Sequence, residues 1–143
     1  DAADCEAHNL ALEEKYRQIA AGETRWADRD LEDAELVLVA YGTMARIAST
    51  AVEVLRGQGI RAGLFRPITL WPFPAEPLAA LAVSDRVRAF LTVEMSLGQM
   101  VEDVRLAVKG GRPVSFLGRT GGVIPQVDEI AAAARACMGG EGV

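Results

Sequence analysis

Four short apolar runs divide most of the chain into alternating segments. They span residues 35–41, 61–66, 88–94 and 113–117. The first and third runs are hydrophobic without interruption, rather than at every second position, and this is typical of strands covered on both faces of a parallel sheet. The pattern therefore predicts four buried β-strands.

Segments with helical periodicity lie between and after these runs. We expect helices over residues 43–57, 74–81, 100–109 and 127–138. Thr43 is the expected N-cap of the first of them, and Pro74 suits the first turn of the second, where a missing N–H group costs nothing. The strict alternation of strand and helix predicts an α/β fold, with an open parallel sheet and right-handed crossovers.

The first thirty residues have a different pattern. Leu12, Tyr16 and Ile19 line one face of an amphipathic helix expected over residues 4–21, with Gly22 as its C-cap. A polar stretch over residues 23–33 follows, and we expect it to be a connector whose Trp26 docks on the domain body. We place a boundary near residue 31, which divides the chain into an N-terminal helix and connector (1–30) and an α/β domain (31–143). Because the chain opens within a helix and without Met, we expect it to be a piece of a longer protein.

Composition narrows the possible classes of function. The 143 residues are 50% hydrophobic and carry a formal net charge of −5, which suits one globular domain with a full core and argues against nucleic acid as a partner. The apolar runs are too short to span a membrane, and the acidic start is unlike a signal peptide, so we expect a cytoplasmic protein. Two cysteines near opposite ends and a single histidine give neither a metal-ligand spacing nor a Ser-His-Asp relay.

Two glycine-containing loops follow predicted strands, where ligands of open α/β sheets bind. Gly42 and Thr43 begin a helix whose first N–H groups can receive an anion. After the last strand, Arg119 and Gly121 belong to a glycine-rich loop that can cradle a phosphate. Neither loop has the three-glycine pattern of dinucleotide sites, so a plain turn is the alternative interpretation of each.

The loop after the second strand is the most unusual stretch, because residues 67–74 hold three prolines and two large aromatic residues. Prolines stiffen the backbone and extend the residues before them, so Trp71 and Phe73 are expected on a rigid arm. The two side chains either pack against another surface or cover the core of this domain. Arg66, at the end of the strand, can pair with a carboxylate within the chain or across an interface.

Glu94 ends the third apolar run, and Gly98 and Gln99 precede the next helix. A buried glutamate can act as an acid or base, but no histidine, nucleophile or second carboxylate is placed to complete a mechanism. We therefore expect Glu94 to cap backbone N–H groups and fix its loop. Met95 and Met100 are expected to fill gaps in the core.

Four motifs in order carry a resemblance to a known family. They read VAYGT, GLFRPITLWPFP, VEMSLGQMVEDVR and GRTGG. In this order they resemble the C-terminal part of the α subunit of thiamine-diphosphate-dependent 2-oxoacid:ferredoxin oxidoreductases, and most closely the 2-oxoisovalerate and 2-oxoglutarate enzymes. The resemblance implies a transketolase C-terminal-like domain, which has three α/β/α layers around a mostly parallel sheet of about five strands. The apolar runs account for four of them.

The resemblance also implies a function for the parent protein. Such enzymes decarboxylate a 2-oxoacid, for which the resemblance implies 2-oxoisovalerate, and use thiamine diphosphate, Mg²⁺ and iron-sulfur clusters to reduce ferredoxin and form an acyl-CoA. None of the residues that hold these cofactors is recognisable here, so we expect a structural, docking fragment without catalytic residues. On this view the contacts with other domains and subunits come from Arg66, Trp71, Phe73, Glu94, Gly98 and Gln99. Coenzyme A contact through the Gly42 or Gly121 loops is the remaining cofactor hypothesis.

Two other classes of function stay open. One is a free-standing flavodoxin-like or nucleotide-binding module. This sequence lacks the clustered acids or glycines that such modules need. The other is a complete small enzyme, which would need a nucleophile and a base at a spacing that this sequence does not offer.

Overall fold

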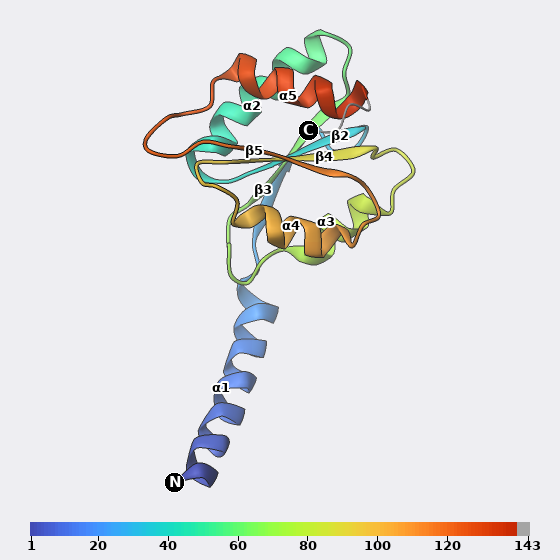
Figure 1. Cartoon of the computed structure of the whole chain (residues 1–143). Helices are drawn as coiled ribbons and strands as arrows, with labels where there is room; N and C mark the ends of the chain where they lie inside the picture. The colour runs from blue at the N-terminus through green and yellow to red at the C-terminus, as the bar shows by residue number, and fades with distance from the viewer. Residues whose placement is uncertain (140–143) are drawn as a thin grey trace.

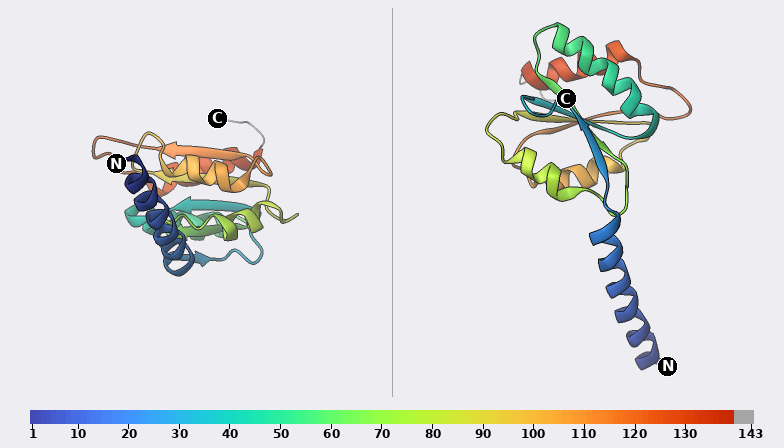
Figure 2. Two further views of the ribbon diagram at one scale, coloured as in Figure 1. Left: turned by 90° about the horizontal axis from the view of Figure 1, so that it is seen from below. Right: turned by 180° about the vertical axis from the view of Figure 1, so that it is seen from behind.

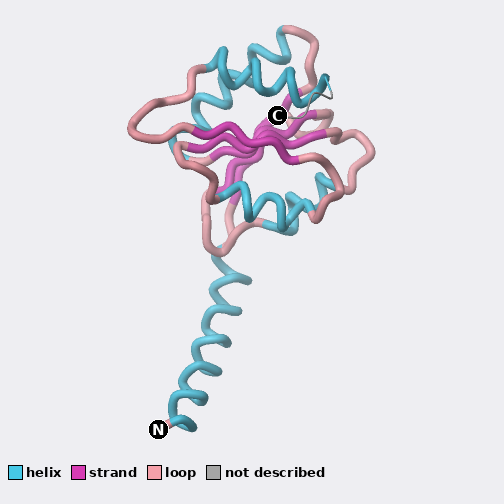
Figure 3. Tube along the Cα trace, viewed as in Figure 1, coloured by secondary structure: helices cyan, strands magenta, loops and turns pink. Residues whose placement is uncertain are grey.

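A five-stranded sheet lies between two layers of helices in the computed structural model, which describes residues 1–139 (Figure 1). Helices α2 (Gly42–Gly57) and α5 (Val127–Gly139) cover one face, and α3 (Ala75–Ala82) and α4 (Met100–Val108) cover the other. Figure 3 shows the same three layers by type of secondary structure. The predicted three-layer α/β/α fold is confirmed.

The strands follow the order β1-β3-β2-β4-β5 across the sheet. Strands β2 (Leu36–Ala40), β3 (Ala62–Pro67), β4 (Ala89–Glu94) and β5 (Val114–Gly118) correspond to the four predicted apolar runs and are parallel. All residues of β2 and β4 are buried, as their continuous hydrophobicity indicates. Each face of the sheet contributes to its own core, one beneath α2 and α5 and the other beneath α3 and α4.

The fifth strand is β1 (Trp26–Arg29), which pairs antiparallel with β3 at the edge of the sheet. The sequence analysis placed this segment in a polar connector. Three of the four residues of β1 are exposed, because a strand at the edge of a sheet is covered less than a central one. An edge strand therefore needs no continuous run of hydrophobic residues. The sheet therefore draws residues from both sides of the boundary predicted near residue 31, and the division of the chain into two domains stays a prediction.

Helix α1 (Ala2–Glu23) projects from the body of the domain (Figures 1 and 2). It begins with a capping box made by Asp1 and Asp4, and Arg17 pairs with Glu14 along its surface. None of its residues is buried. Tyr16 of the expected amphipathic face meets the ring of Trp71, and Leu12 and Ile19 of that face are only partly covered. Gly22, expected as the C-cap, lies within the helix, which ends at Glu23 with Thr24 as its C-cap.

The start of α2 corrects another expectation. The helix begins at Gly42, and its N-cap is Tyr41, without a capping hydrogen bond from a side chain. Thr43 is therefore the second helical residue and not the cap. The first turn of the helix already closes at Tyr41, whose carbonyl accepts a hydrogen bond from the Ala45 N–H group at 3.2 Å. Gly42 between them has a positive φ of 55°, which glycine adopts with little strain.

Gly63 of β3 lies directly against the connection from β1 to β2. A Cβ atom at this position would lie 2.6 Å from the backbone oxygen of Asp30 and 2.7 Å from a methyl carbon of Leu31. The turn after β1 can therefore pack on β3 only because residue 63 has no side chain.

Replacing Gly63 with Ala should destabilise the domain by about 1–3 kcal/mol, because the added methyl group overpacks the turn after β1. Urea unfolding measures this directly. The matched control is Gly57→Ala, at the last residue of α2, where an added Cβ meets nothing within 4 Å. That variant should be at least as stable as the unmodified chain, since Ala has a higher helix propensity than Gly. Equal effects of the two substitutions would contradict the close packing at Gly63.

Candidate functional site

The carboxyl ends of the four parallel strands face one edge of the sheet, and the loops that follow them form the candidate site. In open α/β sheets this edge is where ligands and partners bind. The strand order reverses direction at β2, because the chain passes first to β3 on one side and then to β4 on the other. Strand β1 runs the opposite way, so α1 also leaves the body at this edge (Figure 2).

The loop after β2 leaves the start of α2 without a side-chain partner. Gly42 and Thr43 are exposed, and the first turn of the helix has neither a capping side chain nor an acidic residue. The positive end of the helix dipole and the first N–H groups therefore face solvent.

The loop after β5 is differently arranged. The Arg119 guanidinium forms an ion pair with Glu129 of α5, so much of its charge is already balanced. Gly121 is exposed and has a positive φ of 66°, as a turn at this point requires. Strand β4 lies between β2 and β5, so the two predicted anion loops are not neighbours in the sheet.

The aromatic arm after β3 separates its two aromatic residues. Trp71 is 61% exposed, follows the end of β3, and meets the ring of Tyr16 of α1 edge-on at a centroid distance of 5.5 Å. Its peptide bond to Pro72 is cis. Phe73 is half-buried and packs on the core beneath α3 and α4. Phe73 thus covers the domain's own core, whereas Trp71 is presented outward.

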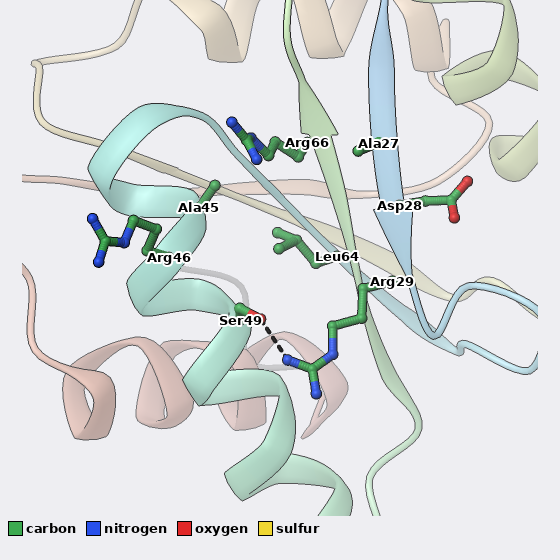
Figure 4. Close-up of a pocket in the computed structure, with 8 residues that line it drawn as sticks. All are labelled: Ala27, Asp28, Arg29, Ala45, Arg46, Ser49, Leu64 and Arg66. Carbon is green, nitrogen blue, oxygen red and sulfur yellow. Dashed lines mark hydrogen bonds between the residues drawn. The ribbon is translucent and has the colours of Figure 1, made fainter.

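Arg66 borders a cavity of about 370 Å³ between α2 and the β1–β3 pair (Figure 4). Arg29 closes one end of this cavity, because its guanidinium donates to the Ser49 hydroxyl at 2.6 Å and to a Glu53 carboxylate oxygen at 2.8 Å. The hydrogen bond to Glu53 is the main reason that the pKa of Arg29 is raised above its usual value. Arg66 forms no ion pair with any residue in 1–139, so its charge is available to a partner.

Glu94 is fully buried at the end of β4, and its carboxylate holds the loop that follows. It accepts hydrogen bonds from the N–H groups of Gln99, Met100 and Val101 at 3.2, 3.0 and 2.9 Å. The Ser96 hydroxyl donates to it as well, at 3.0 Å. The expected capping role is therefore observed: the carboxylate satisfies the first N–H groups of α4 and stands where negative charge favours a helix start.

The negative charge at the start of α4 also affects a neighbouring carboxyl group. Burial raises the pKa of Asp103 above its usual value, and the charges of Glu94 and Glu102 add to this effect.

The structure reveals apolar surface that the sequence analysis missed in these loops. Met95 is 43% exposed and Leu97 is 83% exposed, so the expectation that Met95 fills the core is wrong, whereas Met100 is buried as expected. Exposed apolar side chains lie in the loops that follow β3, β4 and β5, namely Ile68, Leu70, Trp71, Met95, Leu97, Val123 and Ile124. We call these seven residues the apolar edge. Their position in loops that follow predicted strands was the signal available in the sequence.

The residues that the structure describes offer no ligand set for the metal centres expected of the parent. Within 1–139, no three His, Cys, Asp or Glu side chains are grouped so that they could hold a metal ion. Cys5 is exposed on α1 and Cys137 half-buried on α5, which is no ligand set for an iron-sulfur cluster. The same residues include no helix that is both long and apolar enough to cross a membrane.

Comparison with known proteins identifies similar sequences. Residues 34–130 match the family described as pyruvate:ferredoxin oxidoreductase core domain II. The ketoisovalerate oxidoreductase subunit VorB of Methanothermobacter thermautotrophicus is 44% identical over 127 residues, which are 89% of this chain and 35% of that protein. The 2-oxoglutarate synthase subunit KorA of Methanothermobacter marburgensis is 39% identical over 105 residues, or 73% of this chain and 26% of its own. The chain thus spans about a third or less of these relatives.

Solved structures share the fold. A 2-oxoglutarate:ferredoxin oxidoreductase from Magnetococcus marinus superposes with a TM-score of 0.76 at 13% sequence identity. The match covers 96% of this chain and 24% of the chain of that enzyme. A split gene transketolase superposes with a TM-score of 0.68 at 21% sequence identity. The match covers 80% of this chain and 41% of the transketolase chain.

Exchanging Glu94 for Gln should destabilise the domain by about 2–3 kcal/mol, because the amide removes the charge and turns an NH₂ group towards donors. The amide protons of Met100 and Val101 should also exchange faster with solvent. The control is Glu102→Gln, whose carboxylate is exposed and pairs only with Arg105. Its effect should stay within about 0.5 kcal/mol. Unchanged exchange at both amides in Glu94→Gln would show that the carboxylate does not hold this loop.

Proposed function

The chain belongs to the family of pyruvate:ferredoxin oxidoreductase core domain II, and from this premise we propose that it is a docking domain without catalytic residues in a 2-oxoacid:ferredoxin oxidoreductase. The parent would catalyse oxidative decarboxylation of a 2-oxoacid to an acyl-CoA with reduction of ferredoxin. The relation to VorB favours 2-oxoisovalerate as the substrate. Thiamine diphosphate, Mg²⁺ and the iron-sulfur clusters would be held by other domains or subunits of a cytoplasmic assembly.

The observation that carries the docking role is the apolar edge. Isolated apolar side chains are normal on a protein surface, but seven of them in three loops at one edge of the sheet indicate contact with a partner. Trp71 is the most prominent anchor, since a rigid, exposed tryptophan is the kind of residue on which binding energy concentrates. The free-standing ligand-binding module explains neither this surface nor the family match.

The proposed interface residues have different tasks. Trp71 contacts the partner directly, and Arg66 pairs with a partner carboxylate, while Phe73 anchors the arm to the core. Glu94, Gly98 and Gln99 act through the shape of the loop they form, because the Glu94 carboxylate is buried and binds the Gln99 N–H group. The contact surface of that loop is then Met95 and Leu97.

Gly42 and Thr43 remain our proposed anion contacts, for instance with a coenzyme A phosphate, because α2 begins without a cap or an acidic residue. Arg119 and Gly121 are the weaker pair, since Arg119 already pairs with Glu129.

The 143-residue chain alone should not decarboxylate 2-oxoacids. Incubation with thiamine diphosphate, Mg²⁺, 2-oxoisovalerate and an artificial electron acceptor should give no turnover above that of the heat-denatured chain. Release of CO₂ by the native chain, above this background, would refute the assignment as a domain without catalytic residues.

Trp71→Ala should weaken binding of the chain to the rest of the parent assembly by about 30-fold, the loss typical of an interface anchor. The melting temperature of the chain should change little, because Trp71 is exposed. Phe73→Ala is the matched control and should cost about 2 kcal/mol of stability, less than for a fully buried phenylalanine. Calorimetry and a binding titration separate the two effects. A large drop in stability for Trp71→Ala, with unchanged binding, would place Trp71 in the domain's own core.

A further inference from the structure

A groove runs between β1 and α3 on the face of the sheet that α3 and α4 cover. It consists of two adjoining cavities of about 560 and 360 Å³, which share Trp26 and Pro77 as lining residues. The first lies beside the aromatic arm and the end of α1, and the second extends along β1 and α3. We call it the β1–α3 groove.

The groove exists because the helical layer does not extend over the edge strand. On this face α3 packs against α4, and α4 lies against β4 and β5 at the far side of the sheet. Along β1, Ala27 and Arg29 face α2, whereas Asp28 points the other way (Figure 4). Trp26 shares the side of Asp28, as strand alternation requires, and remains 42% exposed.

The floor of the groove is apolar and partly aromatic. The apolar residues that line it are Trp26, Leu31, Phe65, Pro72, Phe73, Pro74, Pro77 and Leu81. A half-exposed tryptophan in a concave apolar site can bury a large area when a partner covers it. The aromatic arm with Trp71 borders the same groove, so the groove continues the proposed docking surface.

The rim of the groove is negative. Asp28, Glu32 and Glu76 line it from β1, the following turn and the first turn of α3. Within residues 1–139, no Lys or Arg lines either cavity, and none of these three carboxylates forms an ion pair. The other side of β1 is mainly positive, since Arg29, Arg46 and Arg66 border the cavity beneath α2, with Asp28 as the carboxylate among its lining residues.

We propose that the β1–α3 groove binds a basic amphipathic segment of the parent assembly that lies outside these 143 residues, with Lys or Arg beside apolar side chains. The proposal rests on the docking role and names the partner chemistry. The apolar side chains cover Trp26 and the groove floor, and the cations pair with Asp28, Glu32 or Glu76. A cation beside Trp26 or Phe73 gains further from the negative face of the aromatic ring.

The negative charge of the rim argues against two other occupants of the groove. The exposed helix α1 of a second copy carries more carboxylates than cations and would be repelled by the negative rim. A nucleic acid would be repelled for the same reason.

Photo-crosslinking in the assembled parent tests the occupant. Ala80 is exposed at the groove, and Ala80→p-benzoylphenylalanine places a crosslinker there, with the same change at exposed Thr50 on α2 as the control. Mass spectrometry should identify, from Ala80 only, a segment in which Lys and Arg outnumber Asp and Glu and alternate with apolar residues. An acidic segment, a second copy of this chain, or no crosslink at Ala80 would overturn the proposal.

Isosteric charge removal provides the second measurement. The double variant Asp28→Asn/Glu76→Gln should weaken binding to the rest of the assembly roughly fivefold and reduce the salt dependence of binding. The control Asp85→Asn/Asp128→Asn removes the same charge outside the groove and should change neither. If Trp71→Ala weakens assembly while the groove variant binds and responds to salt like the unmodified chain, the groove proposal is wrong but the docking function stands. If neither variant affects assembly, the docking function itself fails.

Discussion

One buried carboxylate holds the loop after β4 at the candidate functional edge of this domain. Glu94 ends a strand that is buried along its whole length, and it accepts hydrogen bonds from the first N–H groups of α4. A buried charge is costly unless it is fully hydrogen-bonded, and here each oxygen has a donor. The carboxylate thereby joins sheet, loop and helix at a single point. Met95 and Leu97 are presented to solvent because the loop that carries them is held on both sides.

The same residue shows how a polar group in a core can be structural rather than chemical. A buried glutamate at the carboxyl end of a strand resembles a catalytic acid or base in position. Its hydrogen-bond partners among the described residues are three backbone N–H groups and the Ser96 hydroxyl, and all of them belong to the loop and helix that follow it. Geometry therefore supports a domain that organises a surface, in agreement with the role we propose within a larger oxidoreductase.

The sequence predicted the parts of the fold that depend on burial. Four strands and the helices between them follow from continuous apolar runs and helical spacing, and the structure has them within a few residues. Strand β1 was missed because an exposed edge strand such as Trp26–Arg29 needs no hydrophobic pattern. Thr43 was misplaced because the first turn of α2 closes on the Tyr41 carbonyl, and no side-chain hydroxyl caps it. The exposure of Met95 and the β1–α3 groove depend on which elements pack together, and local patterns do not contain that information. The candidate site was therefore predicted in its position, at the strand ends, but only partly in its residues.

The central claim is that this domain uses the carboxyl edge of its sheet and the adjoining β1–α3 groove to hold its parent assembly together. Hydrogen–deuterium exchange of the chain, measured alone and within the assembly, tests it most directly. The account predicts slower exchange on assembly in residues 68–74, 95–99 and 26–32, with the exposed side of α2 unchanged. Equal exchange in both states at these segments, or protection confined to α2 and α5, would contradict it.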